Sequence, residues 1–373
     1  MRMLVLSIEY PPLGGGASPM IHEINKQFIL RGHEVTVVTM AYNGLPANEI
    51  VDGVNVFRIN SFRRLKHKSR VSEHLAFLYA GRKFLDGFVT MQRFDICFAH
   101  FLVPTGILAR WLYKSHKIPY IITAHGSDIP GFNPDRFRVH HWFTPILIRS
   151  IIHNSIGVVL PSRYLMSMII KVKGVDNEKL VHIPNGIDTD VFVPGPKKNI
   201  LLSTGRLLPR KGFQHLIDAI ADEPFPFEVH ICGDGPMMNT LREKAKSSKT
   251  KIFFHGWIDG KSEQYKTLLS HAAIYCLVSA KENASISLLE ALSAGCAVIT
   301  SNVSGCPESV GKAGICIPPG DIVTLRTELR KLVNQPELMI HLGKEGRQRA
   351  LDEYSWTNVT EKYLALVPQS HKQ

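Results

Sequence analysis

At 373 residues with 45% hydrophobic side chains, the chain can bury two hydrophobic cores, so we expect two domains. No apolar run approaches the roughly 18 residues of a membrane-spanning helix, and the apolar N-terminal segment is too short for a signal peptide. The net charge of +12 permits an anionic partner, but no DNA- or RNA-binding motif accompanies it, so nucleic acid is not an expected partner.

In the first half of the chain, short apolar segments alternate with helix-like segments, which is typical of parallel sheets with crossover helices. Helices are expected near 18–31, where Gly32 ends the first, and at 72–88, where the pattern is amphipathic. The expected strands are 3–7, 34–39, 55–59, 96–99, 120–124 and 157–161.

The same alternation starts again after residues 193–198, a stretch rich in proline, glycine and lysine that we interpret as a linker. The strands expected there are 200–204, 228–232, 252–255, 274–278 and 297–300, and two helices close the chain, at 337–353 and up to about 366. We therefore predict an α/β protein with domains at 1–192 and 193–353 and a C-terminal segment at 354–373.

The six cysteines are scattered, mostly in apolar strand-like runs, and no two stand at the spacing of metal ligands. This usage is typical of reduced core residues in a cytoplasmic protein.

Glu282 and Glu290, separated by seven residues, follow the expected strand 274–278. The first falls on the loop after the strand and the second inside the next helix, so both can face a ligand at that helix's N-terminus. Helix starts can hold a diphosphate without a metal. Because carboxylates repel phosphates, we expect Glu290 to accept hydrogen bonds from a ribose and Glu282 from a sugar. Alternatively, Ser287 and Glu290 form a capping box, and Glu290 is structural.

Other strand ends in the second half also carry residues suited to a nucleotide diphosphate. Arg206 and Lys211 lie between a strand and a helix, where cations can reach phosphate oxygens, although a solvated basic turn is the alternative. Gly233 follows the next strand in a glycine turn, which is common in many folds. Trp257 and Ile258 follow the third strand, and Trp257 can instead pack against a helix.

The segment 275–300 resembles the signature of family 4 glycosyltransferases, retaining enzymes of the GT-B fold, and further matches extend over nearly the whole chain. The resemblance implies two Rossmann-like parallel-sheet domains that face each other across a cleft, with the last helix returning to the N-terminal domain. It implies that a sugar moves from a nucleotide-sugar donor to an acceptor in polysaccharide or glycolipid synthesis. It also implies that the anomeric configuration is retained and that the leaving phosphate takes the acceptor proton.

The resemblance also assigns roles to individual residues. Arg206 and Lys211 match the family's diphosphate-binding pair, and His125 resembles its histidine at the transferred sugar, although a structural histidine is the alternative. The expected catalytic residues are His125, Glu282, Arg206 and Lys211. The expected donor-binding residues are Gly15, Gly16, Arg206, Lys211, Gly233, Trp257, Ile258, Glu282, Ala284, Ser285, Ile286 and Glu290. Gly15 and Gly16 suit a close approach of the backbone to the donor.

Ala284 and Ser285 replace the Phe-Gly that is commoner in the family. The change can alter donor choice or mark a non-catalytic subunit that binds a nucleotide sugar, and a sugar-nucleotide epimerase is the third alternative. Asp188 and Asp190 have the D-x-D form that binds a divalent cation in the other large glycosyltransferase fold, but here we assign them to turn chemistry. We therefore expect no metal and no cofactor, with a UDP- or GDP-sugar as substrate.

The first half of the chain is the more basic, with 22 Lys or Arg and 14 Asp or Glu in residues 1–190. A basic cluster at 63–70 precedes the amphipathic helix 72–88, and such pairs can bind anionic lipid, although a solvated face is the alternative. We expect a cytoplasmic enzyme, peripheral on the inner face of the cell membrane, that acts on a lipid-linked or other glycan acceptor. No oligomeric state follows from the sequence.

Overall fold

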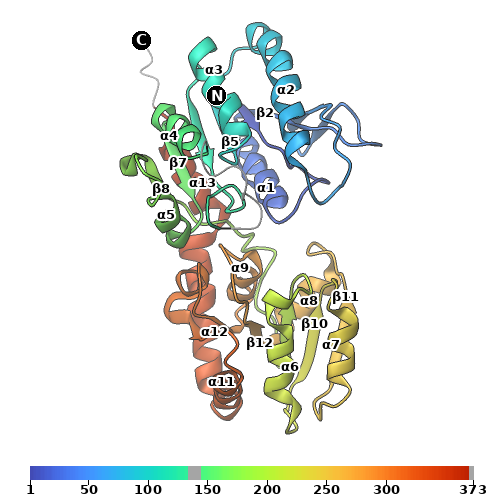
Figure 1. Ribbon diagram of the computed structural model, residues 1–373. Coiled ribbons are helices and arrows are strands. Elements are labelled where there is room, and N and C mark those ends of the chain that lie inside the picture. Colours follow the sequence, from blue (N-terminus) through green and yellow to red (C-terminus); the bar gives the residue numbers. More distant parts are fainter. Residues whose placement is uncertain (133–143, 369–373) are drawn as a thin grey trace. The chain divides into compact units, whose positions relative to one another are not determined.

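The computed structural model describes residues 1–132 and 144–368, which divide into two compact units (Figure 1). The first unit contains residues 1–184 together with the end of the chain from 359 onward, and the second contains residues 185–358. Each unit is built on its own β-sheet.

The first sheet has eight strands in the order β3-β4-β2-β1-β5-β6-β7-β8, and all neighbours run parallel except the edge pair β3 and β4. The strands are β1 (Arg2–Leu6), β2 (Glu34–Met40), β3 (Asn48–Val51), β4 (Val54–Ile59), β5 (Ile96–His100), β6 (Tyr120–Thr123), β7 (Gly157–Leu160) and β8 (Leu180–His182). The helices are α1 (Ala17–Leu30), α2 (Val71–Met91), α3 (Thr105–His116), α4 (Thr144–Asn154), α5 (Arg163–Ile169) and the short η2 (Asn177–Lys179).

The second sheet has six parallel strands in the order β11-β10-β9-β12-β13-β14. They are β9 (Lys198–Thr204), β10 (Glu228–Cys232), β11 (Ile252–Gly256), β12 (Ala272–Leu277), β13 (Ala297–Ser301) and β14 (Gly314–Ile317). The helices are α6 (Phe213–Ala221), α7 (Met238–Ala245), α8 (Glu263–His271), α9 (Ile286–Ser293), α10 (Cys306–Val310), α11 (Ile322–Asn334), α12 (Pro336–Arg349), the π-helical η5 (Ala350–Tyr354) and the start of α13 (Trp356–Ala365). Short 3-10 turns, η3 (Pro209–Lys211) and η4 (Gly311–Ala313), complete the unit.

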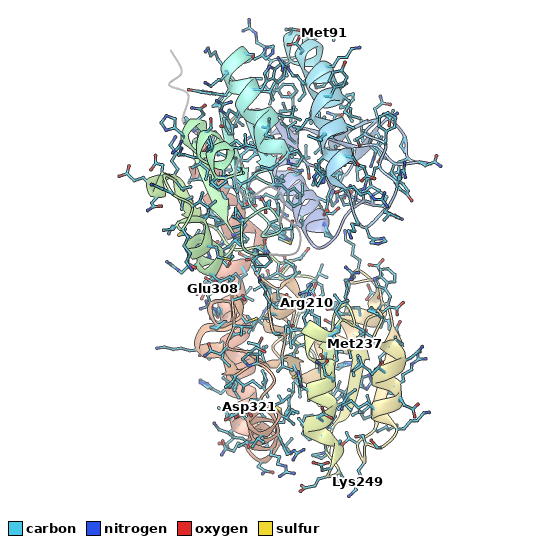
Figure 2. All side chains as sticks on the ribbon, viewed as in Figure 1. Met91, Arg210, Met237, Lys249, Glu308 and Asp321 are labelled. Carbon is cyan, nitrogen blue, oxygen red and sulfur yellow. The ribbon has the colours of Figure 1, made fainter. Side chains whose placement is uncertain are left out.

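Apolar layers cover both faces of the second sheet. Successive residues of β9 enter different layers, because side chains alternate along a strand: Leu201 packs with α6 and α11, and Leu202 packs with α8 and α9. Figure 1 shows α6 and α7 side by side on one face, and Figure 2 shows side chains filling the space between sheet and helices. Burial on both faces explains why these strands are continuous apolar runs.

The second unit begins before the expected linker at 193–198. The N–H group of Ile187 donates to the carbonyl oxygen of Tyr354 at 2.7 Å, and Phe192 is buried in the layer that contains α8 and α9. Gly186 lies so close to Trp356 that an added Cβ would be 2.4 Å from the indole ring. These contacts attach residues 185–192 to the second unit.

The end of the chain belongs to the first unit. From Val359 onward, α13 is part of that unit, and the buried ring of Tyr363 lies 6.5 Å from the Phe28 ring and 6.4 Å from the Phe98 ring, between centroids. The Tyr363 hydroxyl is 3.2 Å from the hydroxyl oxygen of Thr123. The chain therefore enters the first unit twice.

In both sheets the strand order reverses beside the unit's first strand. From β9 the chain moves outward through β10 and β11, then returns to the other side of β9 as β12. The first sheet reverses in the same way between β1 and β5. Open α/β sheets bind ligands outside the carboxyl ends of their strands at such reversals. Both reversals therefore mark positions for a site.

All six cysteines are free thiols, and only Cys316 is not fully buried. Their place in the core agrees with the expectation from the sequence. Within residues 1–132 and 144–368, no helix is both long and apolar enough to cross a membrane.

Candidate functional site

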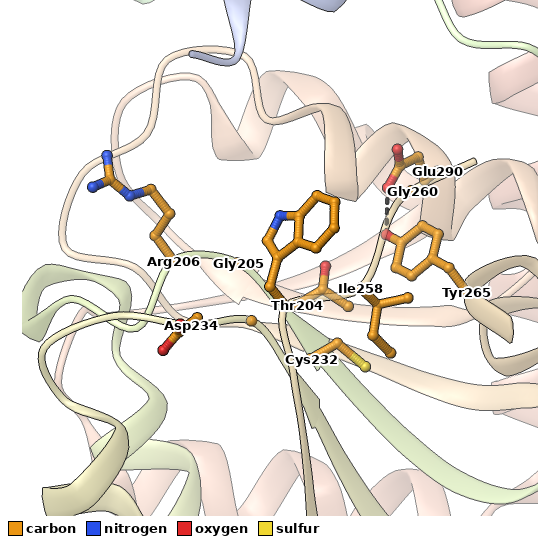
Figure 3. Close-up of a pocket in the computed structure, with 11 residues that line it drawn as sticks. Thr204, Gly205, Arg206, Cys232, Asp234, Ile258, Gly260, Tyr265 and Glu290 are labelled. Carbon is orange, nitrogen blue, oxygen red and sulfur yellow. Dashed lines mark hydrogen bonds between the residues drawn. The ribbon is translucent and has the colours of Figure 1, made fainter. Parts of the chain in front are cut away.

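The second unit contains a cavity of about 260 Å³ at the carboxyl ends of β9, β10 and β11 (Figure 3). Five residues predicted from the sequence line it: Arg206, Gly233, Trp257, Ile258 and Glu290. The other lining residues are Thr204, Gly205, Cys232, Asp234, Gly260 and Tyr265. Arg206 and Glu290 lie on opposite sides of the cavity in Figure 3. The fold therefore gathers side chains from distant parts of the sequence around one space.

Glycine turns bring the strand ends of the cavity wall together. Gly205 and Gly233 have φ of +146° and +147°, a region that favours glycine. An added Cβ on Gly233 would lie 1.8 Å from the carbonyl oxygen of Gly205. The Gly233 N–H group also donates to the Gly256 carbonyl oxygen at 2.6 Å. Gly233 is thus required by close backbone packing, whatever else it contacts.

Glu290 accepts a hydrogen bond through Oε2 from the hydroxyl of Tyr265 at 2.5 Å, drawn as the dashed line in Figure 3. Burial raises the pKa of Glu290 to about 7, while the bond from Tyr265 acts in the opposite direction. Burial, and secondarily the charge of Glu290, raises the pKa of Tyr265 well above its ordinary value. Glu290 therefore changes its charge near neutral pH.

The capping-box alternative for Glu290 is wrong. Helix α9 begins at Ile286 with Ser285 as its N-cap residue, so Ser287 lies inside the helix and cannot start it. Glu290 is consequently beyond the first turn, where no capping role requires a glutamate.

Sequence reasoning missed Tyr265. It is buried in the first turn of α8, and it follows the Trp257 loop by a few residues. A tyrosine near a helix start is common in many proteins, so the sequence alone offers no signal that this hydroxyl meets Glu290. A second tyrosine, Tyr275 of β12, places its hydroxyl 2.8 Å from the Thr204 hydroxyl and supports the same wall from within.

Lys211 and Glu282 form a salt bridge at the reversal between β9 and β12. Lys211 ends the turn η3 after β9, and Glu282 lies on the loop after β12. The Ser279 hydroxyl donates to the same carboxylate oxygen at 2.8 Å. Both partners are largely buried, so the pair is held in place rather than solvated. The cation predicted for phosphate and the carboxylate predicted for sugar are therefore bonded to each other.

Two glycines fix the loops that carry this salt bridge. Gly212 has φ of +80°, and an added Cβ would lie 2.2 Å from the carbonyl oxygen of Val278. An added Cβ on Gly305 would lie 1.7 Å from the carbonyl oxygen of Asn283. Any larger residue at either position would push apart the loops that hold Lys211 and Glu282.

Ser285 adopts its conformation without strain. Its φ of −74° and ψ of 116° are ordinary for any residue, so the backbone here does not require the glycine that is commoner in the family. Its hydroxyl lies 3.0 Å from that of Ser287. The neighbouring Ala284 carbonyl accepts from the side-chain amide of Asn185 at 3.1 Å.

Asp188 has the role in a turn that the sequence predicts. Its Oδ1 atom accepts from the N–H groups of Asp190 and Val191, both at 3.1 Å. Among the described residues, no group of three or more His, Cys, Asp or Glu side chains is arranged to hold a metal ion.

His125 lies in the first unit, directly after β6. Its Nε2 atom is 3.1 Å from Nδ1 of His100, and its backbone N–H group donates to Oδ1 of Asp128 at 3.0 Å. Burial lowers the pKa of His125 to about 3 and that of His100 well below its ordinary value. Both imidazoles are therefore neutral at physiological pH, and His125 can offer hydrogen bonds but no positive charge.

The glycine run after β1 contains one position that needs glycine. Gly14 has φ of +110°, and an added Cβ would lie 2.5 Å from Oε2 of Glu9. Gly15 donates its N–H to the same carboxylate at 3.0 Å, and neither Gly15 nor Gly16 has any neighbour that a Cβ would meet within 4 Å. The space beside them is open, and their contact with a donor stays a prediction.

The predicted residues thus fall into three groups. Five line the cavity of the second unit. Five more lie after β9 and β12 in the same unit: Lys211, Glu282, Ala284, Ser285 and Ile286. The remaining three, Gly15, Gly16 and His125, belong to the first unit.

Comparison with known proteins shows the family to which the chain is related. Residues 14–191 match the model of glycosyltransferase family 4, and residues 188–349 match that of glycosyl transferases group 1. The chain is 24% identical to a GDP-mannose-dependent alpha-(1-6)-phosphatidylinositol monomannoside mannosyltransferase of Mycolicibacterium smegmatis, with 95% of each chain covered.

Two solved structures show the same fold at low sequence identity. Sucrose-phosphate synthase from Thermosynechococcus elongatus has a TM-score of 0.79 at 17% identity, with 98% of each chain covered. HepE from Anabaena in complex with UDP-glucose has a TM-score of 0.74 at 16% identity, again with 98% of each chain covered. With family models matching from residue 14 to residue 349 and this structural likeness, the chain has the GT-B fold and belongs to the family 4 glycosyltransferases.

Proposed function

We propose that the chain is a retaining, metal-independent glycosyltransferase that moves a sugar from a UDP- or GDP-sugar to a lipid-linked or other glycan acceptor. The cavity of the second unit carries this proposal, because Arg206, Trp257 and Glu290 all line it. Each suits one part of a nucleotide diphosphate: a cation for the phosphates, an aromatic ring for the base, and a carboxylate for the ribose hydroxyls.

The relatives support a nucleotide-sugar donor but differ in its base. HepE was solved with UDP-glucose, whereas the mannosyltransferase relative depends on GDP-mannose. The cavity wall includes three glycines, Gly205, Gly233 and Gly260, which have no side chain to select a base. Such a wall accommodates either base, so the donor has to be identified by experiment.

The Lys211–Glu282 salt bridge suggests how a donor is recognised. When a sugar hydroxyl donates a hydrogen bond to Glu282, it replaces part of the interaction between Glu282 and Lys211. The ammonium group then turns its charge toward a phosphate oxygen. This exchange keeps both groups partnered before and after binding, so neither buried charge is left alone.

For the reaction we propose substitution on one face of the sugar. The acceptor oxygen forms a bond to the anomeric carbon while the bond from that carbon to the phosphate oxygen breaks, and the acceptor proton passes to the leaving phosphate. Arg206 and Lys211 stabilise the negative charge that develops on the phosphate, which makes a metal ion unnecessary. The protein otherwise orients the reactants. His125, being neutral, holds a sugar hydroxyl by a hydrogen bond.

The decisive test incubates the full chain with UDP-, GDP- and ADP-sugars, with and without a lipid-linked acceptor, and follows release of the nucleotide. We expect release of one nucleotide that depends on the acceptor and is unaffected by a chelator, with retained anomeric configuration by NMR. Conversion of the donor without acceptor would identify an epimerase. Binding without turnover would identify a non-catalytic subunit, and an inverted product would refute the proposed reaction.

We also propose a cytoplasmic location at the inner face of the cell membrane. The support for it is the basic first half of the chain.

A further inference from the structure

One surface of the first unit has no role in the proposed chemistry. It consists of the loop 62–70 and the exposed side of α2 from Val71 to Tyr79, here called the loop-α2 surface. We propose that the loop-α2 surface docks the enzyme on a membrane that contains anionic lipid, and that the sugar acceptor is anchored in that membrane. The inference of a membrane-anchored acceptor rests on the proposed function, whereas the inference of a docking surface does not.

Helix α2 carries two separate apolar stripes. Phe77 and Leu85 are fully buried and attach the helix to its unit. Val71, Leu75 and Tyr79 recur at every fourth position and are 50%, 61% and 78% exposed. Residues spaced by four lie on the same helix face, so they form a continuous apolar stripe toward solvent. Packing within the unit does not explain this stripe, and such exposed patches mark interaction sites.

The loop before α2 adds two more exposed apolar side chains. Phe62 is 74% exposed, and Leu65 is 40% exposed. Phe62 also has φ of +58°, a left-handed conformation that is costly for a bulky residue. Strained residues persist where the surrounding structure holds them, often at functional positions. The Phe62 ring nevertheless stays mostly exposed to solvent.

Every exposed charge on this segment is positive. Arg64, Lys66, Lys68 and Arg70 are exposed, and the only acid between residues 61 and 85 is Glu73, which is buried. The two carboxylate oxygens of Glu73 accept from the backbone N–H groups of Arg64 and Arg70, at 3.2 and 2.8 Å. Cations that flank an exposed apolar stripe fit an anionic lipid surface, and the apolar part favours lipid over nucleic acid.

Hydrogen bonds from a buried arginine hold the loop 62–70 in a defined conformation. The Arg63 guanidinium is buried and donates to the carbonyl oxygens of Ile8, Leu65 and Lys66, at 2.7, 3.0 and 3.1 Å. Arg63 therefore anchors the loop and, unlike the other cations of the basic cluster at 63–70, is buried. Its neighbours in the loop are turned outward as a result.

The same loop is bonded to the glycine run after β1. The Gly14 N–H group donates to the carbonyl oxygen of Lys66 at 2.9 Å, and the next residue is Gly15, which is predicted to approach the donor. A surface that touches a bilayer here would place that run close to lipid head groups. An acceptor whose anchor stays in the bilayer would be presented beside this run, which is why we infer a lipid-linked acceptor.

The test is flotation of the full chain with vesicles of phosphatidylcholine alone and of phosphatidylcholine mixed with phosphatidylglycerol. We expect binding only to the mixed vesicles, weakened by salt. Three variants should bind roughly tenfold or more weakly: Leu75→Ser with Tyr79→Ser, Lys66→Glu with Lys68→Glu, and Phe62→Asn. Asparagine tolerates the positive φ at position 62, so the last variant should fold as well as the wild type.

Matched controls lie in the second unit. Val323→Ser removes an equally exposed apolar side chain (73%) from α11, and Arg242→Glu with Lys249→Glu reverses two exposed charges. Both should bind vesicles like the wild type. The surface assignment would be overturned if vesicle binding by the control variants weakened as much as binding by the loop-α2 variants. It would also be overturned if the wild type bound DNA or RNA but no vesicle.

Two further readouts separate this inference from the proposed function. Calorimetry with UDP and GDP should give the same affinity for every loop-α2 variant and the wild type. Nucleotide binding without vesicle binding refutes the surface alone, and vesicle binding without nucleotide binding refutes the proposed function alone. Turnover of a vesicle-embedded acceptor should fall in the variants, while turnover of its water-soluble analogue stays unchanged. An equal fall for both acceptors refutes the lipid-linked acceptor.

Discussion

The two sheet reversals of this molecule offer different chemistry. In the second unit, the residues around the reversal are charged and paired, as in Lys211 with Glu282. In the first unit, the corresponding position holds two neutral imidazoles, His100 and His125, 3.1 Å apart. A charged environment suits a diphosphate, and a neutral one suits uncharged hydroxyl groups. The two units are alike in architecture, and the proposed function assigns them different parts of one reaction.

The pKa values of a glutamate and a histidine in the two units also stand in the reverse of their usual order. Histidine is usually the side chain that titrates near neutral pH. Here burial lowers the pKa of His125 to about 3 and raises that of Glu290 to about 7. Burial penalises whichever form is charged, so it moves an acid upward and a base downward. We therefore expect Glu290 of the second unit, and not the histidines of the first unit, to determine the pH dependence.

The largest expected effect comes from removing one member of the salt bridge in the second unit. Lys211→Ala and Glu282→Ala should each lower kcat by roughly 100-fold or more, because each loses a group that acts in the transition state and leaves its partner unpaired. Steady-state kinetics, with circular dichroism to verify folding, is the measurement. Arg210→Ala removes an adjacent exposed cation and should keep nearly full activity. Wild-type rates in both salt-bridge variants would contradict the assignment.

The next effect concerns Glu290. Below its pKa of about 7 the side chain is protonated and loses acceptor strength, so donor affinity should rise about tenfold between about pH 6 and pH 8. Calorimetry with a nucleotide sugar measures this, because its diphosphate does not titrate in that range. Glu290→Gln should bind weakly and show no such pH dependence.

The variant Tyr265→Phe tests whether Glu290 is the group that causes this pH dependence. The lost hydrogen bond otherwise lowers the pKa of Glu290, so the pH profile of this variant should move upward. An unchanged midpoint in Tyr265→Phe would show that another group causes the pH dependence.

A smaller effect is expected in the first unit. His125→Gln keeps a neutral hydrogen-bonding side chain and should lower kcat only a few-fold, while His125→Ala should lower it about tenfold. Neither should change donor affinity or the pH profile between about pH 5 and pH 8, because the imidazole is already neutral there. A new pH dependence in His125→Gln would refute a neutral role.

The smallest effect concerns the glycine run. Gly15→Ala should change the free energy of unfolding by less than about 0.5 kcal/mol, since a Cβ there meets nothing within 4 Å. Gly14→Ala should cost about 1–2 kcal/mol because its φ is +110°. Chemical denaturation measures both. If Gly15→Ala also keeps full turnover, the donor does not approach this backbone.

Most strands were predictable because buried parallel strands are continuous apolar runs between turn residues. The short strands β3, β8 and β14 were missed, since each has only three or four residues and most of these are not fully buried. The domain boundary was placed at a linker-like composition, whereas Ile187 and Phe192 join residues 185–192 to the second unit through long-range contacts. Composition indicates flexibility locally, but it carries no information on which core a segment joins.

By itself, the sequence determined the parallel α/β architecture, the strand ends that carry Arg206 and Gly233, and the helix that carries Glu290. It could do so because apolar runs and turn residues are local properties of the chain. Only the tertiary structure decided that Tyr265 bonds Glu290, that Lys211 pairs with Glu282, and that α2 has one buried and one exposed apolar stripe. These depend on which distant residues share a space, and burial then sets their charge.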